Sequence, residues 1–124
     1  MATVNYTITK TSNPLVWIVS WEGLAGATAD VGQAFDVSTV PGAGGADRSV
    51  QFLGTFGTST LLIEGSNDGG TTWATLADPQ GNALSKTAAG IEAVLEYTRA
   101  IRPSVAGGGS GSGLKVYLVV RGSR

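Results

Sequence analysis

The sequence contains no cysteine and no histidine. Without cysteine there are no disulfides. Without histidine, neither a Ser-His or Cys-His nucleophile pair nor a histidine metal site can be built. Most hydrolytic chemistry is thereby excluded, and we expect a protein that is not an enzyme and holds no metal or cofactor. The lack of cysteine, together with an N-terminus that has no secretory signal pattern, argues against an oxidised, secreted scaffold.

Charge and long apolar runs are scarce as well. Charged residues make up 14% of the chain, and the formal net charge is -1. Such a chain has little with which to neutralise a row of phosphates, which argues against a nucleic acid partner. The longest apolar runs, at 15–19 and 118–120, are far shorter than the roughly 20 residues of a membrane-spanning helix. We therefore expect a soluble protein with neither a nucleic acid nor a membrane as partner.

What the chain does contain is glycine, threonine, serine and short runs of alternating polarity. Its 124 residues include 19 glycines, and turn signals recur about every ten residues, as in sandwiches and barrels. We predict one domain, residues 1–124, that is all-β: an antiparallel β-sandwich, a jelly roll of about eight strands. The predicted strands lie at 4–10, 15–21, 33–37, 48–56, within 61–76, and at 91–97, 100–105 and 114–121.

Two of these strands carry open questions. The stretch 91–97 fits a helical face as well as a strand, and we favour the strand because Gly90 and Thr98 leave room for barely two helical turns. Pro103 lacks an N–H and therefore predicts a sheet edge or a bulge for the strand 100–105.

The clearest element is a hairpin within 61–76. Its turn, Asn67-Asp68-Gly69-Gly70, supplies residues that accept positive φ, as a connection between twisted strands requires. Trp73 follows the turn, and we expect its ring to fold over Gly65 and Ser66 and to anchor one sheet. The residues assigned to this structural hairpin are Gly65, Asn67, Asp68, Gly69 and Trp73.

The predicted strand 15–21 is apolar on both faces, so a sheet centre, a subunit contact or a partner surface could cover it. Trp17 and Trp21, four residues apart on one face, fit core or interface packing better than a platform for sugar rings. For Arg99 and Arg102 three placements stay open: an intrachain ion pair, exposure to solvent, or contact with a partner. The residues assigned to a possible contact with a partner or another subunit are Val16, Trp17, Ile18, Trp21, Arg99 and Arg102.

Other features favour ordinary structural explanations. The glycine cluster at 41–47 matches no phosphate-binding spacing and predicts a mobile surface loop. The cluster at 107–113 predicts a flexible connection between antiparallel strands. Strand alternation puts Glu92 and Glu96 together on a solvated face, which argues against a glycosidase pair. A calcium site at Asn67, Asp68 and Asp78 matches no known loop spacing, and an Asx-type turn is the better explanation.

The hairpin 64–73 followed by Arg99-Ala100-Ile101-Arg102 resembles the "GSNDG-x-x-W" hairpin and "ARYIR" strand of discoidin-like jelly rolls. In that family the motif builds the sandwich and does not bind ligand. The resemblance therefore supports the fold.

A second resemblance covers most of the chain. It rests on 4–10, 46–52, 54–57, the hairpin, 78–84, 88–92, 101–103 and the glycine-rich turn before the last strand. These stretches look like the decoration, or cement, proteins of tailed bacteriophage capsids. The resemblance implies a structural protein of the virion that is made in the host cytoplasm and binds the outside of the major capsid shell. It also implies self-association into dimers or trimers. The alternative function is a carbohydrate-binding jelly roll displayed on the virion.

Overall fold

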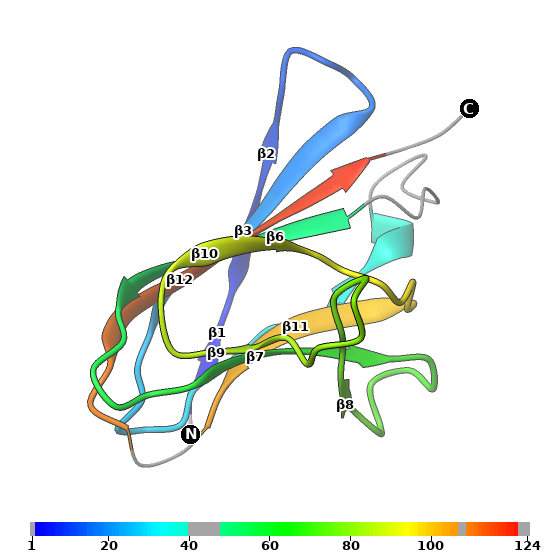
Figure 1. Ribbon diagram of the computed structural model, residues 1–124. Coiled ribbons are helices and arrows are strands. Elements are labelled where there is room, and N and C mark those ends of the chain that lie inside the picture. The colour runs from blue at the N-terminus through cyan, green and yellow to red at the C-terminus, as the bar shows by residue number, and fades with distance from the viewer. Residues whose placement is uncertain (1, 40–47, 107–108, 122–124) are drawn as a thin grey trace.

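The computed structural model of the chain describes residues 2–39, 48–106 and 109–121. These residues form two β-sheets with a shared core (Figure 1). The five-stranded sheet has the order β10 (Gly90–Ala93), β6 (Arg48–Thr55), β12 (Ser112–Arg121), β3 (Val16–Leu24), β2 (Tyr6–Lys10). The seven-stranded sheet has the order β1 (Thr3–Val4), β4 (Val31–Gly32), β11 (Ala100–Val105), β7 (Leu61–Ser66), β8 (Ala74–Thr75), and in addition β5 (Phe35–Asp36) pairs with β11 and β9 (Ser85–Lys86) pairs with β7.

From β3 onward the chain passes repeatedly from one sheet to the other. β3, β6, β10 and β12 lie in the five-stranded sheet, and the strands between them lie in the other. This is the connectivity of a jelly roll. The described residues contain one 3-10 turn, Val37–Thr39, and no α-helix, so none of them forms a helix able to span a membrane.

The prediction of an all-β sandwich of jelly-roll type is confirmed. The described residues form twelve strands where about eight were predicted. The difference arises because five of the twelve are two-residue pairings, which are too short to produce an alternating sequence pattern.

Strand alternation is the part of the sequence that the fold follows most closely. In β12 the inward residues Leu114, Val116, Leu118 and Val120 are all buried, as predicted. β12 pairs with β6 on one side and with β3 on the other, which makes it the central strand of its sheet. Such a strand needs apolar side chains on its core face, and each of these four is 0% exposed.

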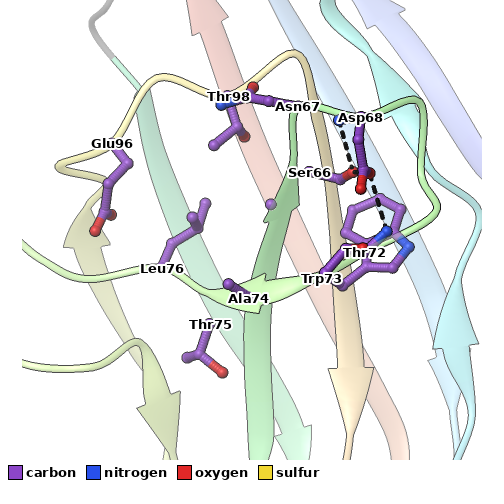
Figure 2. A pocket seen from close by; sticks show the side chains of 11 residues that line it. Ser66, Asn67, Asp68, Thr72, Trp73, Ala74, Thr75, Leu76, Glu96 and Thr98 are labelled. Carbon is purple, nitrogen blue, oxygen red and sulfur yellow. Dashed lines mark hydrogen bonds between the residues drawn. The ribbon is translucent and has the colours of Figure 1, made fainter.

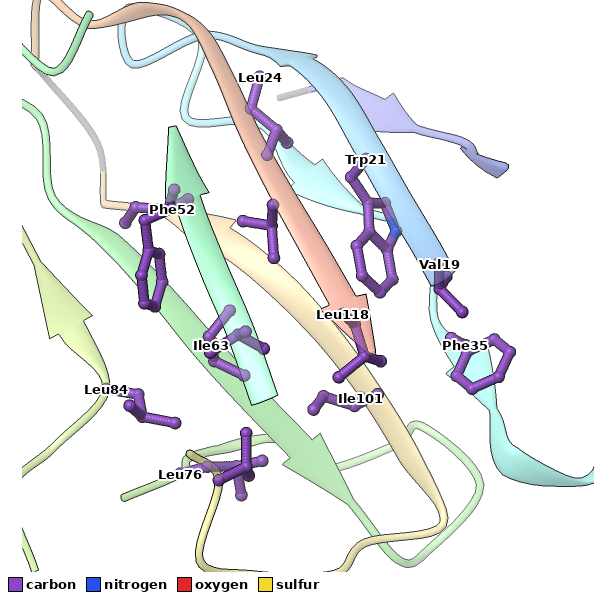
Figure 3. Packing of buried hydrophobic residues seen from close by; sticks show 14 of the residues in the cluster. Val19, Trp21, Leu24, Phe35, Phe52, Ile63, Leu76, Leu84, Ile101 and Leu118 are labelled. Atoms are coloured by element: carbon purple, nitrogen blue, oxygen red, sulfur yellow. The ribbon is translucent and has the colours of Figure 1, made fainter. Parts of the chain in front are cut away.

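Trp21 is the largest fully buried side chain (Figure 3). It is 1% exposed, its ring packs edge-on against Tyr6 at 6.1 Å, and its Nε1 donates a hydrogen bond to the carbonyl of Gln33 at 2.9 Å. Trp17 is also buried, at 8% exposure. Both rings therefore pack in the interior, which agrees with the preferred interpretation of core or interface packing. The assignment of Trp17 and Trp21 as capsid or subunit contacts is wrong for the folded chain.

The prediction that Pro103 marks an edge or a bulge is also wrong. Its strand, β11, lies inside the seven-stranded sheet, between β7 and the short strands β4 and β5. β5 pairs with Ala100 and Ile101, and β4 pairs with Ser104. Pro103 thus lies where one neighbour has ended and the next begins, so a missing N–H is tolerated there.

The bounds of three other segments also differ from those predicted. The segment 23–32, which the predicted strands leave out, extends β3 to the buried Leu24 and ends in the strand β4. The strand predicted at 33–37 is reduced to β5, and Val37 begins the 3-10 turn. The strand predicted at 91–97 is β10, which ends at Ala93.

The described part of the second glycine cluster, residues 109–113, is packed into the framework. Gly109 and Gly111 are buried, the Gly111 N–H donates to Ser59 Oγ at 2.7 Å, and the Gly26 N–H donates to the Gly111 carbonyl at 2.9 Å. The cluster joins β11 to β12, which lie in different sheets, so it does not form the expected hairpin. The first glycine cluster, at 41–47, lies outside the described residues.

Asp30 ties the N-terminal segment to the fold. It is 5% exposed, and its carboxylate accepts hydrogen bonds from Ala2 N at 3.1 Å, Ala25 N at 3.0 Å and Thr28 Oγ1 at 2.6 Å. The bond from Thr28 is the largest cause that lowers the pKa of Asp30 below its ordinary value, against the opposing effect of burial.

We expect Asp30→Asn to destabilise the protein by roughly 1 to 2 kcal/mol at pH 7, because the new amide N–H donors would face the N–H and O–H donors that now bond the carboxylate. The folded-state pKa is lowered, so the contribution of Asp30 is present above its unfolded pKa of about 3.9 and is lost as the pH falls through the folded value. Urea unfolding at pH 7 and pH 3 should therefore show a smaller difference in the free energy of unfolding between variant and parent at pH 3. An equal gap at both values would contradict this role for the charge.

Candidate functional site

The hairpin loop between β7 and β8 is held by one carboxylate (Figure 2). Asp68 accepts hydrogen bonds from Thr72 N at 2.9 Å, Thr71 N at 3.1 Å and Ser66 Oγ at 2.8 Å. These donors, the Thr72 N–H foremost, lower the pKa of Asp68 to about 2. The loop is thus organised by Asp68, and its glycines take the positive φ values, 79° at Gly69 and 88° at Gly70. The predicted hairpin is confirmed.

Trp73 does not anchor the sheet. Its ring lies 4.1 Å from the guanidinium carbon of Arg102, and its Nε1 donates to the Gly70 carbonyl at 3.0 Å. The space over Gly65 is filled by Thr98 and Leu76 instead. Trp73 is half-buried and lies outside the core cluster. The expectation that it packs over Gly65 and Ser66 is therefore wrong.

A groove of about 480 Å³ lies beside this loop. Figure 2 shows the residues that line it: Gly65, Ser66, Asn67, Asp68, Thr72, Trp73, Ala74, Thr75, Leu76, Glu96 and Thr98. Its polar side chains already bond within the chain. Asn67 accepts from Arg99 N at 2.8 Å, and Glu96 accepts from Ala77 N at 2.7 Å. The groove therefore offers few polar groups for a ligand.

The acidic residues considered for a glycosidase pair or a calcium site lie apart, and each makes its own local contact. Glu92 pairs with Lys86 at 3.1 Å, which links β10 to β9 across the open side of the sandwich. Glu96 lies beyond the end of β10, so the two glutamates do not share a strand face as expected. Asp78 caps its own turn by accepting from Gln80 N and Asn82 N. Within the described ranges, no group of three or more Asp or Glu side chains could hold a metal ion.

The two arginines assigned to contacts both form intrachain ion pairs. Arg99 Nε lies 3.1 Å from Asp36 Oδ2, and Arg102 Nε lies 2.9 Å from Glu64 Oε1. The Arg102 pair is well shielded, whereas the Arg99 side chain is 65% exposed. Of the remaining contact candidates, Val16 and Ile18 are partly exposed on the outer face of β3.

The residues that the sequence patterns did not reveal lie in β10 and just after it. Ile91, Leu95 and Tyr97 are 64%, 55% and 41% exposed, and they are the large hydrophobic side chains that the described structure leaves most open. We call 91–97 the apolar segment. The sequence signal that could have revealed these exposed residues is the ambiguous periodicity of 91–97. Where a stretch fits neither a helix nor a strand throughout, its apolar residues need not all face the core.

Arg48 contacts the apolar segment from its buried side. It is 5% exposed, its Nη2 donates to the Thr98 carbonyl at 2.8 Å, and its guanidinium carbon lies 4.3 Å from the centre of the Tyr97 ring. Burial lowers the pKa of the guanidinium, and Tyr97 opposes this shift. Nε and Nη1 have no hydrogen-bond partner among the described residues. The path of the chain from β10 to β11 is thus fixed by a buried cation.

The fold defines the class: an all-β, two-sheet sandwich of jelly-roll type. No family model matches the chain, and no curated protein matches it. Among solved structures the chain is similar to a cupin domain from Bordetella pertussis, with 13% sequence identity over 100% of this chain and 99% of that one and a TM-score of 0.45. A likeness of this size carries no argument about function.

Proposed function

We propose that the chain is a non-catalytic structural protein of a tailed-bacteriophage virion, a decoration protein that binds the outside of the major capsid shell and stabilises contacts between capsomers. The sequence resemblance supports this class of protein. The observation that points to a contact surface is the apolar segment. Ile91, Leu95 and Tyr97 all lie within 91–97 and are all exposed, and large exposed apolar side chains are a feature of sites that bind another protein.

The proposed contact is apolar rather than ionic. The ion pairs Lys86–Glu92, Arg99–Asp36, Arg102–Glu64 and Lys115–Glu22 already engage much of the chain's charge. Little charge then remains to steer attachment, so we expect capsid binding to depend weakly on salt. Many copies, each bridging capsid subunits, would stabilise the shell through multivalent attachment even where each single contact is weak.

Leu95 is the residue of choice for a test. It is 55% exposed and lies beyond the end of β10, so its replacement disturbs neither a strand nor the core. We expect Leu95→Asp to weaken binding to capsids that lack the protein by at least about tenfold, or roughly 1.4 kcal/mol, because a carboxylate would be buried against apolar surface. Co-sedimentation with such capsids measures the binding, and the temperature at which they release DNA measures the stabilisation.

Leu62→Asp is the matched control. Leu62 is a half-buried leucine on the outer face of the seven-stranded sheet and lies outside the apolar segment. The Leu62→Asp variant should bind and stabilise capsids as the parent does. Failure of the parent to bind any capsid would reject the proposed function, whereas normal binding by Leu95→Asp would reject only the proposed contact.

A further inference from the structure

β10 forms one edge of the five-stranded sheet, and the side of β10 that faces away from β6 is open. Among the strands that the structure describes, β10 pairs only with β6. Gly90, Ile91 and Ala93 are exposed, and a Cβ atom at Gly90 would meet nothing within 4 Å. A strand at the edge of a sheet presents backbone N–H and C=O groups that can pair with another chain.

The register of β10 on β6 determines which backbone groups are open. The Val94 N–H donates to the Arg48 carbonyl at 3.1 Å. In the same register, Ala93 lies opposite Ser49. Antiparallel neighbours exchange hydrogen bonds only at every second pair, so the backbone groups of Ile91 and Ala93 point away from β6. The structure gives these groups no partner among the residues it describes. The edge therefore offers two donors and two acceptors.

The opposite edge of this sheet, β2, has two features that hinder the addition of a strand. The Tyr6 N–H already donates to the Gln33 side chain at 3.3 Å, and the strand ends at the exposed Lys10, a residue type that protects sheet edges from pairing. β10 has neither feature. Its one charged side chain, Glu92, is paired with Lys86 at 3.1 Å. Of the two edges, β10 is the better suited to accept a further strand.

The side chains beside the open backbone groups are apolar. Ile91 and Ala93 lie on the outer face of the sheet, because they pair with the outward residues of β6. Ile91 is 64% exposed, and the exposed Leu95 and Tyr97 follow it. Side chains directly opposite each other on neighbouring strands pack together, and β-branched residues pair well with apolar or aromatic ones. The edge therefore suits an extended segment that places an apolar side chain beside Ile91.

We propose that β10 is a strand-addition site, at which an extended segment of the major capsid protein pairs with the backbone of Ile91 and Ala93. The identity of the partner rests on the proposed function, and the inference adds how the apolar segment engages that partner. Backbone hydrogen bonds hold the added segment, while Ile91, Leu95 and Tyr97 supply the apolar contact. The edge 90–94 spans about 17 Å, so each contact is short and stable attachment requires many copies.

Ala93→Pro tests the backbone pairing without removing an apolar side chain. Proline removes the outward N–H, breaks no bond to β6, and is tolerated on an edge strand where the N–H faces solvent. We expect it to weaken binding to capsids that lack the protein at least tenfold in a co-sedimentation titration. Lys10→Pro is the matched control. The Thr11 N–H donates to the Val16 carbonyl, so the Lys10 N–H points away from β3, and its loss from β2 should leave binding unchanged.

Amide hydrogen exchange of the unaltered chain is a second measurement, which decides the matter even if the proline variant fails to fold. The Ile91 and Ala93 amides, followed in peptides that cover 90–94, should exchange at least tenfold more slowly when the chain is bound to capsids. Peptides that cover 6–10 should not change.

The outcomes separate this inference from the proposed function. A parent that binds no capsid would reject both together. A parent that binds capsids with unchanged exchange at 90–94, or with equal effects of the two proline variants, would overturn strand addition alone. Slow exchange of the same amides in a concentrated solution of the isolated chain would assign the edge to a second copy and would also overturn the proposal.

Discussion

Replacing Trp21 with alanine should destabilise the protein by about 3 to 5 kcal/mol, a large part of the 5 to 15 kcal/mol typical of a domain. Trp21 is the largest fully buried side chain, and its removal leaves a cavity between Tyr6 and the rest of the core. The Gln33 carbonyl, which accepts from Trp21 Nε1, would lose its partner as well. Urea unfolding followed by circular dichroism measures the loss, since this signal does not depend on the tryptophan itself.

Trp73→Ala is the matched control, because it removes the same side chain from the surface. Its ring contributes a stack on Arg102 and a hydrogen bond to Gly70. We expect a loss of about 1 kcal/mol, in line with an exposed cation–π contact. A Trp73 variant as unstable as the Trp21 variant would show that the hairpin, and not the interior of β3, anchors the sandwich.

The contrast between these two tryptophans shows how far the sequence predicts this fold. Alternation along 4–10, 48–56 and 114–121 predicted which side chains face the core, because period-two burial is a property of each strand alone. The hairpin turn could be predicted because glycine at positive φ is a local requirement. The sequence also favoured core or interface packing for Trp17 and Trp21, and both are buried. That Trp73 lies outside the core could not be predicted, since this depends on strands distant in the sequence.

The errors share this cause. Pro103 is acceptable inside a sheet because β4 and β5 leave a break beside it, and no local pattern reports such a break. Gly109 belongs to the framework because Ser59, fifty residues earlier in the chain, lies against it. Local propensity describes a segment, whereas burial and close approach describe pairs of segments.

The candidate surfaces were only partly predictable, for the same reason. A strand at β10 was predicted, but only its register with β6 shows that the backbone groups of Ile91 and Ala93 point out of the sheet. The apolar segment was hidden for a different reason. β10 ends at Ala93, so the residues after it leave the alternation that the sequence suggested, and Leu95 and Tyr97 become exposed.

The second large effect is expected at Gly109, where the fold has no room for a side chain. A Cβ atom there would lie 2.5 Å from the Cα and 2.2 Å from the Oγ of Ser59. The serine hydroxyl can rotate away, but the backbone atom cannot. Gly109→Val should therefore displace the loop that closes this end of the sandwich, at a cost of about 3 kcal/mol or more, as measured by urea unfolding.

Gly90→Val is the control, because a Cβ at Gly90 meets nothing within 4 Å and its backbone is ordinary extended strand. Valine suits a strand and reduces the freedom of the unfolded chain, so its stability should stay within about 0.5 kcal/mol of the parent or rise. If both valines were tolerated equally, the residues around Gly109 would have to move apart freely. The loop would then be the flexible connection that its composition suggested, and the hydrogen bonds from Gly111 to Ser59 and from Gly26 to Gly111 would contribute little to the folded state.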